Sequence, residues 1–561
     1  MLDASLDSGA LVNVAAHLPR VAREQPDAPA IWAPDRRGRY TPTTYRELDA
    51  TSDRIARGLG AFGVARGVRV ALMVRPSREL FSLVFGLFKA GAVPVLIDPG
   101  IGLRNMKACL AKARPEAFIG IPSAQLARKA LGWAPSARTL ITVGERTPLT
   151  RGTTLHDVER AGDGSADALA PTRAEDVAAI LFTSGSTGAP KGAVYTHGNF
   201  AAQVDAIRRM YDIRPGEIDL PTFPLFALFD PALGMTTVIP DMDPTRPAKA
   251  DPRKIAAAIE RFGVTNMFGS PALLNTLSRW GEATGRKLPT LRRVISAGAP
   301  VPAAVLARMR AMLDERAVVV TPYGATECLP VATIESREVL DETASATERG
   351  AGVCVGRPVP EAEVAIIGIT DAPIARWSDA EVLGPGEIGE IVARGPMATR
   401  RYFESEEQTA LAKIGDEGGF RHRMGDLGYL DAAGRVWFCG RKSQRVVTAG
   451  ETLFTIPCEG VFNAHPDVFR SALVGATVRG ELVPVVCVEL EKERRDRGRL
   501  VMELRALAHR HAHTRGLRTF LVHPSFPVDI RHNAKIRRED LARWASRELS
   551  SSIAARASRT R

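Results

Sequence analysis

Apolar and polar residues follow two different periods in the first hundred residues. Segments 45–62 and 79–90 have the apolar spacing of helices, whereas 68–74 and 92–98 are short, continuous apolar runs typical of buried strands. Helices that alternate with such strands form βαβ units, in which the strands pair in parallel. The pattern therefore predicts an α/β fold with a parallel sheet.

The alternation resumes after a stretch that is richer in Gly, Pro and Ser, near 145–172. Segment 252–262 has helical spacing, and three short apolar runs predict further strands at 177–182, 265–268 and 294–296. The predicted α/β region therefore extends past the middle of the chain.

From about residue 384 the pattern changes to short strand signals broken by glycines and charged turns, such as 386–393 and 434–439. Such signals predict antiparallel pairing, and a compact α+β end follows. The polar run GRKSQR at 440–445 separates two strand-like stretches and is the predicted hinge. The expected parts are an N-terminal domain over 1–440, a hinge at 441–445 and a C-terminal domain over 446–561.

Composition narrows the class of protein. With 561 residues, 45% hydrophobic and 25% charged, the chain resembles a globular protein of several units. It has no apolar run near the roughly 20 residues that cross a bilayer. Residues 1–10 carry Asp3 and Asp7 and no basic stretch, so we expect no secretory signal. The six cysteines are scattered, without a zinc-binding spacing. We therefore expect a soluble, cytoplasmic protein with reduced thiols.

The net charge of +12 and the pI near 9.6 suggest an alternative class of protein, an anion-binding protein whose partner is a nucleic acid or a membrane surface. The basic residues, mostly arginines, are spread along the chain and do not form a stripe. A compositional bias explains this distribution, so we expect no nucleic-acid partner.

The strongest chemical signal is the segment 181–192, LFTSGSTGAPKG. Its hydroxyl and glycine residues offer backbone N–H groups and short donors without bulk, as closely approached phosphate oxygens require, and Lys191 adds a positive charge. It is not a Walker A loop, because that motif has Gly-Lys-Ser/Thr at the start of a helix, and here Gly192 and a strand-like stretch follow the lysine. The alternative is a flexible surface turn.

Two further motifs are weaker when taken alone. In TPYGATE at 321–327, an aromatic, a glycine, a hydroxyl and a carboxylate are suited to stack a base, admit close backbone approach, contact a phosphate and hold a divalent cation. In GDLGY at 425–429, Asp426 is suited to accept hydrogen bonds from both ribose hydroxyls. The alternative for Asp426 is an ordinary Asx turn.

Together, and in this order, these motifs resemble the adenylate-forming superfamily of acyl-CoA synthetases, nonribosomal peptide adenylation domains and luciferases. The resemblance covers nearly the whole chain. It includes SAGAP at 296–300, which is similar to the superfamily's adenine-pocket segment, and GEIGE at 386–390. It also includes the Gly440-Arg441 pair and NAKIRR at 533–538.

This resemblance implies a large N-terminal adenylation (AMP-binding) domain with stacked mixed sheets and helices and a small barrel-like subdomain. A small, mobile α+β lid domain would follow and carry the catalytic lysine. The resemblance also implies ATP and Mg²⁺ as cofactors, and a reaction that joins a carboxylate to AMP and releases pyrophosphate.

Three catalytic residues are implied by position. Lys535 would bridge the carboxylate and the α-phosphate, where a positive charge between two anions stabilises the transition state more than the separated ground state. Thr326 would contact the α-phosphate, and Glu327 would bind Mg²⁺. The alternative for Lys535 is one cation in an Arg-rich solvated segment.

The resemblance further implies which residues bind the nucleotide. Tyr323 would stack on adenine, Asp426 and Arg441 would hold the ribose, and the loop that ends at Lys191 would wrap the triphosphate. The implied set is Thr183, Ser184, Gly185, Ser186, Thr187, Gly188, Lys191, Gly298, Ala299, Pro300, Tyr323, Gly324, Thr326, Asp426 and Arg441.

Departures from the superfamily pattern carry finer information. Ser443-Gln444 stands where many members have an Asp-Asp pair, which leaves open the domain rotation used for thiolation, and Ala534 replaces the usual glycine before the lysine. The segments IDPGI at 97–101, FALFDP at 226–231 and DIRHNAK at 529–535 resemble the β-lactone synthetases of bacterial long-chain olefin biosynthesis. That resemblance implies a 2-alkyl-3-hydroxy fatty acid, whose own hydroxyl closes a four-membered ring with loss of AMP.

Several points stay open at the level of sequence. Phe226, Ala227, Phe229 and Met235 would form an apolar pocket for the acid, although core packing explains them equally well. No histidine can be assigned as the base for the 3-hydroxyl. A fatty acyl-CoA synthetase is the alternative activity, and a non-catalytic anion-binding protein is the alternative class. Olefin-pathway membership would imply a thiolase-like enzyme, a reductase and a β-lactone decarboxylase as neighbours.

Overall fold

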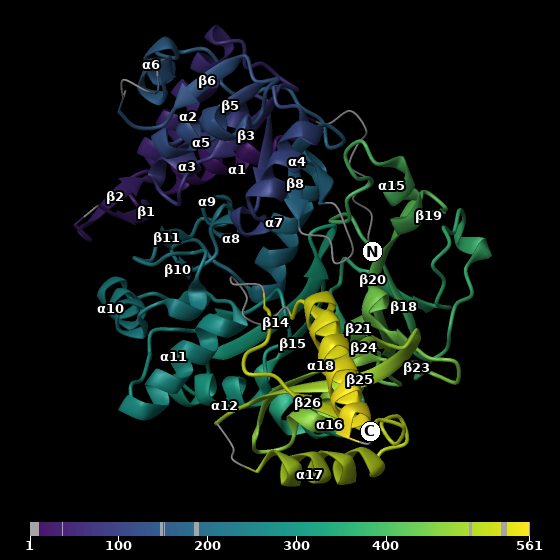
Figure 1. Ribbon diagram of the computed structural model, residues 1–561. Helices are drawn as coiled ribbons and strands as arrows, with labels where there is room; N and C mark the ends of the chain where they lie inside the picture. The colour runs from purple at the N-terminus through teal and green to yellow at the C-terminus, as the bar shows by residue number, and fades with distance from the viewer. Residues whose placement is uncertain are drawn as a thin grey trace.

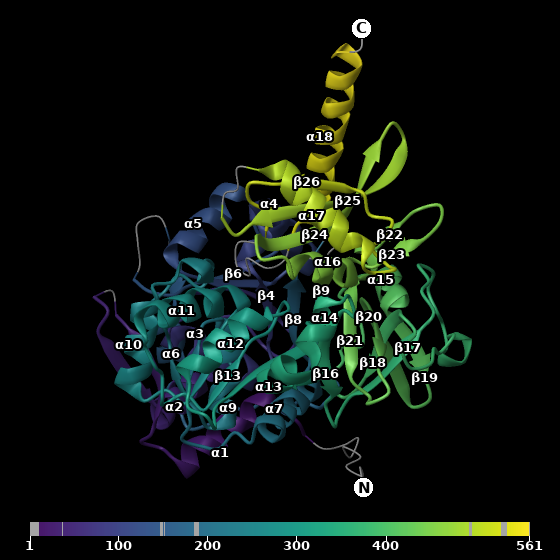
Figure 2. The same cartoon turned by 90° about the horizontal axis from the view of Figure 1, so that it is seen from below.

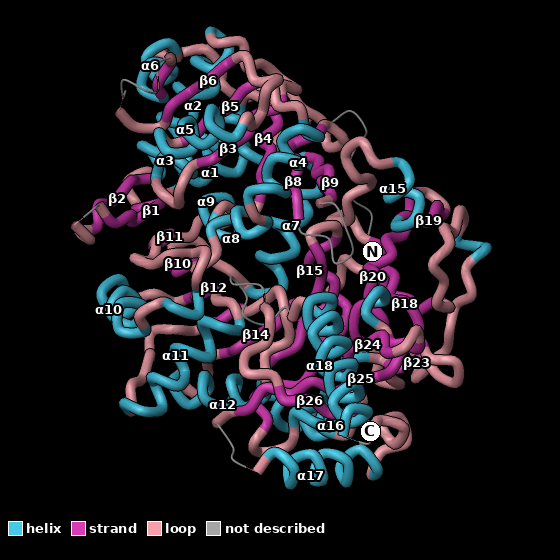
Figure 3. Tube along the Cα trace, viewed as in Figure 1, coloured by secondary structure: helices cyan, strands magenta, loops and turns pink. Residues whose placement is uncertain are grey.

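The computed structural model describes residues 11–35, 37–145, 150, 152–183, 190–492, 496–528 and 536–559. Within these residues the strands form a 14-stranded, a 7-stranded, a 3-stranded and a 2-stranded sheet. In Figure 1 the N-terminal elements, in purple and blue, occupy one end of the molecule, and the yellow C-terminal elements lie together at the other end. In Figure 3 helices gather on the left and at the bottom of the view, whereas strands and loops dominate its right-hand side.

The seven-stranded sheet has the order β7-β6-β5-β3-β4-β8-β9, and its neighbouring strands are parallel except for β8 and β9. Short apolar runs buried on both faces are typical of parallel strands that helices cover. The strands are β3 (Arg69–Met73), β4 (Val93–Ile97), β5 (Ala117–Gly120), β6 (Thr139–Thr142), β7 (Thr153–Thr154), β8 (Val177–Thr183) and β9 (Lys191–Thr196).

The helices of this region confirm the predicted periodicity. The predicted helices 45–62 and 79–90 are α2 and α3, and a capping box in which Thr44 and Glu47 bond each other's backbone starts α2. The helices are α1 (His17–Glu24), α2 (Tyr45–Ala61), α3 (Arg78–Lys89), α4 (Leu103–Ala113), α5 (Pro122–Leu131) and α6 (Leu155–Ala161).

The large sheet is parallel in one half and antiparallel in the other. From β1 through β11, β10, β12 and β13 to β14 all pairs are parallel, and β2 adds an antiparallel edge. The predicted strands at 265–268 and 294–296 are β12 and β13. The strands of this half are β1 (Pro29–Pro34), β2 (Tyr40–Thr44), β10 (Ile218–Pro221), β11 (Thr236–Val238), β12 (Asn266–Phe268), β13 (Arg293–Ile295) and β14 (Val318–Ala325).

The antiparallel half begins at β14 and β15, so the predicted onset near residue 384 is wrong. A two-residue connection joins Ala325 to Cys328, and so tight a link is possible only between antiparallel strands. Among the described strands the pairing runs on to β17 without closing into a ring. The strands of this half are β15 (Cys328–Glu335), β16 (Val353–Pro358), β17 (Glu363–Ile367), β18 (Gly389–Arg394), β19 (Lys413–Asp416), β20 (Gly419–Leu430) and β21 (Val436–Arg441).

Helices pack against the large sheet. The predicted helix 252–262 is α10, which buries one apolar face. The helices are α7 (His197–Tyr211), α8 (Pro224–Ala227), α9 (Asp230–Leu233), α10 (Pro252–Phe262), α11 (Pro271–Thr284), α12 (Ala303–Met312), α13 (Ser336–Glu338), α14 (Ala344–Glu348) and α15 (Glu406–Ala412).

The C-terminal part has the expected α+β character. Its two apolar clusters draw only on residues after 445, and α18 projects away from the rest of the molecule in Figure 2. The proposed domain limits remain a prediction. Among the described residues, no helix is both long and apolar enough to cross a membrane. The elements are β22 (Val446–Val447), β23 (Thr452–Leu453), β24 (Val468–Val478), β25 (Glu481–Leu490), β26 (Thr519–Val522), α16 (Thr455–Asn463), α17 (Arg497–His509) and α18 (Arg538–Arg559).

Candidate active site

A cavity of ≈1260 Å³ lies between the two large sheets and reaches residues 536–539 at the start of the C-terminal helix α18. It is larger than the roughly 300–1,000 Å³ usual for one drug-sized ligand, so it has room for more than one reactant. The predicted site residues that line it are Lys191, Phe226, Phe229, Gly298, Ala299, Pro300, Tyr323, Gly324, Thr326, Glu327, Asp426 and Arg441.

The tip of the β14–β15 hairpin consists of Thr326 and Glu327. Three contacts fix this tip: the Tyr195 hydroxyl donates to the Thr326 carbonyl, the Thr399 N–H donates to the Glu327 carbonyl at 2.8 Å, and the Tyr402 hydroxyl donates to the Glu327 carboxylate at 2.7 Å. The hairpin therefore presents a hydroxyl and a carboxylate to the cavity from a rigid base.

Glycine is required at position 324 of this hairpin. A Cβ added there would lie 2.7 Å from the Cys328 carbonyl oxygen, closer than real Cβ atoms approach. The absent side chain lets the two strands approach each other beside Tyr323. The motif thus keeps its glycine for a packing reason that applies whether or not a ligand is bound.

Asp426 contacts residues of two other predicted nucleotide motifs, Tyr323 and Arg441. It lies opposite Arg441 in the β20–β21 pairing, and its carboxylate is 3.0 Å from the Arg441 guanidinium and accepts a 2.8 Å hydrogen bond from the Tyr323 hydroxyl. Gly425, with φ +66°, supplies the left-handed turn that precedes it. Three residues that are far apart in the sequence therefore form one contiguous polar wall.

Positive charge gathers around Glu327. The Lys191 ammonium lies 5.2 Å from the centre of the Tyr402 ring. Burial lowers the pKa of Lys191, the Glu327 carboxylate opposes that shift, and Lys442 adds to it. Such a partly desolvated cation is suited to phosphate oxygens. Tyr402 carries no local sequence signal, and the sequence analysis missed it.

A second cation, also missed, lies behind Glu327. Burial lowers the pKa of Lys413 to about 8, although the Glu327 carboxylate opposes the shift. Its ammonium lies 3.0 Å from Nδ1 of His422, whose own pKa burial and Lys413 hold well below the usual range. His422 lines the cavity as a neutral imidazole beside Lys413.

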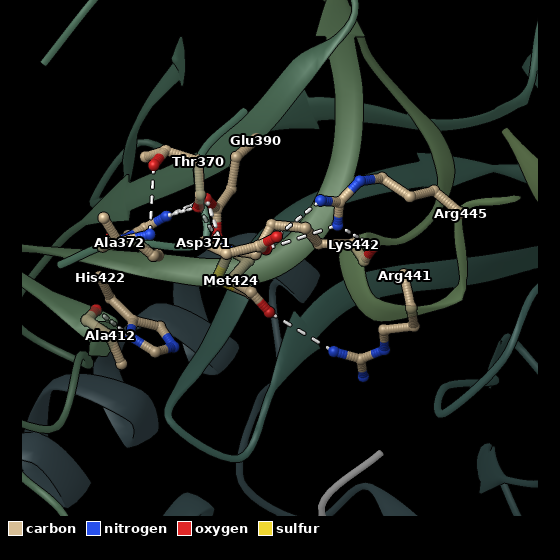
Figure 4. Close-up of polar contacts among 11 residues, drawn as sticks. Thr370, Asp371, Ala372, Glu390, Ala412, His422, Met424, Arg441, Lys442 and Arg445 are labelled. Carbon is tan, nitrogen blue, oxygen red and sulfur yellow. Dashed lines mark hydrogen bonds and ion pairs between the residues drawn. The ribbon is translucent and has the colours of Figure 1, made fainter. Parts of the chain in front are cut away.

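Charged side chains hold the predicted hinge to the part of the chain that precedes it. Lys442 donates to the Glu390 carboxylate at 3.0 Å, and Glu390 is buried in an ion pair with Arg423. Arg445 pairs with Asp371 at 2.8 Å. Figure 4 shows Lys442 and Arg445 directed toward these acids. In this conformation, charged side chains beside Arg441 anchor the segment.

The apolar residues predicted for the acid separate into two groups. Phe226 and Phe229 line the cavity. Ala227 and Met235 are 3% and 2% exposed and lie in the core outside the cavity wall. The short helix α8 directs neighbouring side chains to different sides, which its sequence alone did not reveal.

Other predicted residues are only partly visible or lie outside the described residues. Thr183 ends strand β8, whereas 184–188 and Lys535 lie outside the described residues, as does His532. His197 is fully buried, and burial lowers its pKa to about 4. Its Nδ1 accepts a hydrogen bond from the Val14 N–H at 3.2 Å. His197 is therefore a structural residue, and the base for the 3-hydroxyl stays unassigned.

The fold is that of adenylate-forming enzymes. It superimposes on the amide bond synthetase of Marinactinospora thermotolerans with a TM-score of 0.78, at 23% identity, over 95% of this chain and 99% of that one. The AMP-binding enzyme family matches residues 18–403. The chain therefore belongs to the AMP-binding enzyme family, and it is an AMP-forming enzyme of the ligase type.

Two relatives are similar over nearly their whole length. The olefin beta-lactone synthetase of Stenotrophomonas maltophilia (strain K279a) is 57% identical over 549 residues, which cover 96% of this chain and 98% of the relative. The enzyme of the same name from Xanthomonas campestris pv. campestris is 56% identical over 551 residues, with the same coverage.

Proposed function

We propose that this chain uses ATP to convert a 2-alkyl-3-hydroxy fatty acid into its acyl adenylate, and then closes the acyl adenylate to a β-lactone. One observation carries the proposal: more than half of the residues are identical, over nearly the full length, to two olefin beta-lactone synthetases. The cavity supports it, because one space holds the nucleotide motifs and a large apolar wall.

In the proposed first step, a carboxylate oxygen attacks the α-phosphorus of ATP, and the bond to the β-phosphate breaks to release pyrophosphate. Tyr323 would stack on the adenine, and Asp426 would accept hydrogen bonds from the ribose hydroxyls while Arg441 holds its orientation. Lys191 would neutralise the departing phosphates, and Lys535 would bridge the carboxylate and the α-phosphate. Fixed positive charge at these points lowers the barrier without reorganisation of solvent.

Glu327 fits a Mg²⁺ ligand. Mg²⁺ prefers one or two carboxylates together with substrate phosphates, and the Glu327 carboxylate is held at the cavity wall by the Tyr402 hydroxyl. When bound, the ion would neutralise phosphate charge. Thr326, next to Glu327 on the same hairpin tip, would contact the α-phosphate.

In the proposed second step, the 3-hydroxyl oxygen of the acid attacks the carbonyl carbon of the acyl adenylate. The bond from that carbon to the AMP oxygen breaks, AMP leaves, and the hydroxyl proton passes to solvent. Nucleophile and electrophile are parts of one molecule, so proximity replaces an external thiol. The reaction then requires no coenzyme A.

Product analysis tests the proposal. The chain would be incubated with ATP, Mg²⁺ and a synthetic 2-alkyl-3-hydroxy fatty acid, with and without coenzyme A, and followed by NMR and mass spectrometry. We expect a β-lactone, AMP and pyrophosphate without coenzyme A. A thioester that forms only with coenzyme A, and no lactone, would instead establish a fatty acyl-CoA synthetase.

A matched substrate isolates the second step. With the same acid lacking its 3-hydroxyl, the enzyme should still catalyse ATP–pyrophosphate exchange but should form no lactone. If neither acid supports ATP–pyrophosphate exchange, acid activation itself is wrong. If exchange occurs but the 3-hydroxy acid gives no lactone, only the ring-closure step is wrong.

A further inference from the structure

The segment from α8 (Pro224–Ala227) to α9 (Asp230–Leu233) divides the apolar wall of the cavity. Phe226 and Phe229 both line the cavity, but their rings belong to different aromatic clusters. In Figure 1 the segment lies between α3, in the upper part of the view, and α11, in the lower part. The segment therefore separates the side of the cavity next to the seven-stranded sheet from the side next to the 14-stranded sheet.

The first cluster lies on the side of the seven-stranded sheet. The Phe229 ring is 6.2 Å from that of Phe200 on α7, which is 5.7 Å from that of Phe88 on α3 and stacks at 4.6 Å on Tyr195. All four line the cavity, and Val14 extends the wall. We call this side of the cavity the first arm.

The second cluster lies on the side of α11 and α12. The Phe226 ring stacks on Phe268, at the end of β12, with centroids 4.2 Å apart, and lies 5.6 Å from Phe223. Val301 and Leu306, which belong to the core beneath the large sheet, continue this wall. We call this side the second arm.

The dividing segment is anchored from behind. Asp230, directly after Phe229, is buried, and it accepts a 2.8 Å hydrogen bond from the Thr237 hydroxyl. Beside it, burial raises the pKa of Asp219 to about 7. The Tyr45 hydroxyl donates to the Met235 carbonyl at 2.7 Å. Phe226 and Phe229 therefore project from a fixed backbone into the two arms.

We propose that the two arms receive the two alkyl chains of the acid, one chain in each arm. This inference rests on the proposed function. In a 2-alkyl-3-hydroxy acid the chains diverge from adjacent carbons next to the carboxylate, so the molecule is forked at its polar end. The cavity has a polar wall and a divided apolar wall, and Tyr195 of the first arm contacts the polar hairpin tip through the Thr326 carbonyl. This arrangement matches the forked shape, because each buried methylene then contacts protein on its own side.

Phe268 and Phe200 are the specificity residues that test the inference, since neither lies on the dividing segment. Phe200→Ala and Phe268→Ala would be assayed by ATP–pyrophosphate exchange with three acids. The first acid has two long chains, the second has a short chain at C2 only, and the third has a short chain at C3 only. Phe262→Ala is the matched control, because Phe262 packs on Trp32 and Tyr40 away from the cavity.

We expect a crossed pattern. Each variant should raise the KM of the acid with two long chains about tenfold. For one of the two short-chain acids, each variant should have nearly the same KM as the unaltered chain. This acid should be a different one for each variant. The KM for ATP and the behaviour of Phe262→Ala should match the unaltered chain. Phe200→Leu and Phe268→Leu should show the same pattern, more weakly, and replace any alanine variant whose circular dichroism shows misfolding.

Three outcomes would overturn the inference: both variants respond to the same chain, both respond equally to either chain, or folded variants leave every KM unchanged. Each would assign both chains to one pocket or to none. The unaltered chain separates this failure from that of the proposed function, because normal lactone formation without the crossed pattern rejects only the two arms.

Discussion

The proposed nucleotide region (Tyr323, Thr326, Glu327, Asp426 and Arg441) and the two proposed arms are walls of one cavity, but they are built differently. The nucleotide region stands on strand ends and hairpin tips, and ion pairs and hydrogen bonds hold its side chains. Each arm is assembled from rings on several helices and strands, which contact one another through their apolar faces and edges. Polar chemistry demands fixed atoms, whereas apolar binding demands only a shaped surface.

The two regions also contribute differently to stability. Apolar rings buried in the arms stabilise the fold through the hydrophobic effect. Beside the nucleotide region lie two cations whose charged forms burial disfavours, Lys191 and Lys413, and both interact with Glu327. The comparison leads us to expect that substitutions in the polar part change catalysis or raise stability, and that substitutions in the arms change substrate choice.

The largest expected effect is at Lys535. Lys535→Ala should lower kcat for adenylate formation about 100- to 1,000-fold, because one charge that acts mainly in the transition state is lost. ATP–pyrophosphate exchange measures it. Lys492→Ala, which removes an exposed lysine of the same domain, should leave the rate unchanged. A normal rate in folded Lys535→Ala would remove this residue from the reaction and leave the nucleotide region without its transition-state cation.

The next effect is at Asp426. Asp426→Ala should raise the KM for ATP about 10- to 100-fold, through the loss of two hydrogen bonds to a charged acceptor, with a smaller change in the KM for the acid. Isothermal titration with ATP measures the affinity directly.

Asp431→Ala is the control for this variant. Asp431 directly follows β20, the strand that carries Asp426, and pairs with Arg435 at 2.8 Å. It does not line the cavity. Its loss should lower Tm without weakening ATP binding. Equal ATP affinity in Asp426→Ala and the unaltered chain would show that Asp426 only holds Arg441 and Tyr323.

The smallest expected effect is on stability, at Lys413. Burial lowers the pKa of this ammonium to about 8 in the folded protein. Below that pH the folded protein holds the buried charge, and this lowers its free energy of unfolding. The penalty is fully present at pH 7 and is relieved as the pH rises from about 8 toward the usual value for lysine, since the unfolded chain alone still binds the proton there. Lys413→Met should therefore raise Tm by about 2–4 °C at pH 7.

The gain in Tm should shrink between pH 8 and 10, which scanning calorimetry at several pH values would follow. Lys129→Met, at an exposed lysine on α5, should change Tm little at any of them. A lower Tm for Lys413→Met at pH 7 would mean that Glu327 compensates the buried charge in full, and that the nucleotide region is not destabilising.

Local sequence was enough for much of the fold. Segments 45–62, 79–90 and 252–262 are helices α2, α3 and α10, because their apolar residues recur with helical spacing. The change from parallel to antiparallel pairing was placed too late. The decisive feature is a two-residue hairpin at Thr326 and Glu327, which the sequence analysis interpreted only as chemistry.

The sequence by itself determined the reaction class, because the polar motifs are contiguous runs and their order along the chain resembles that of adenylate-forming enzymes. Only the tertiary structure decided that Asp426 meets Tyr323, that Tyr402 and Lys413 stand beside Glu327, and that Phe226 and Phe229 face opposite arms. Apolar residues look alike in a sequence whether they fill a core or line a cavity, since both positions only require exclusion from water. Their roles depend on which distant segments the fold brings against them.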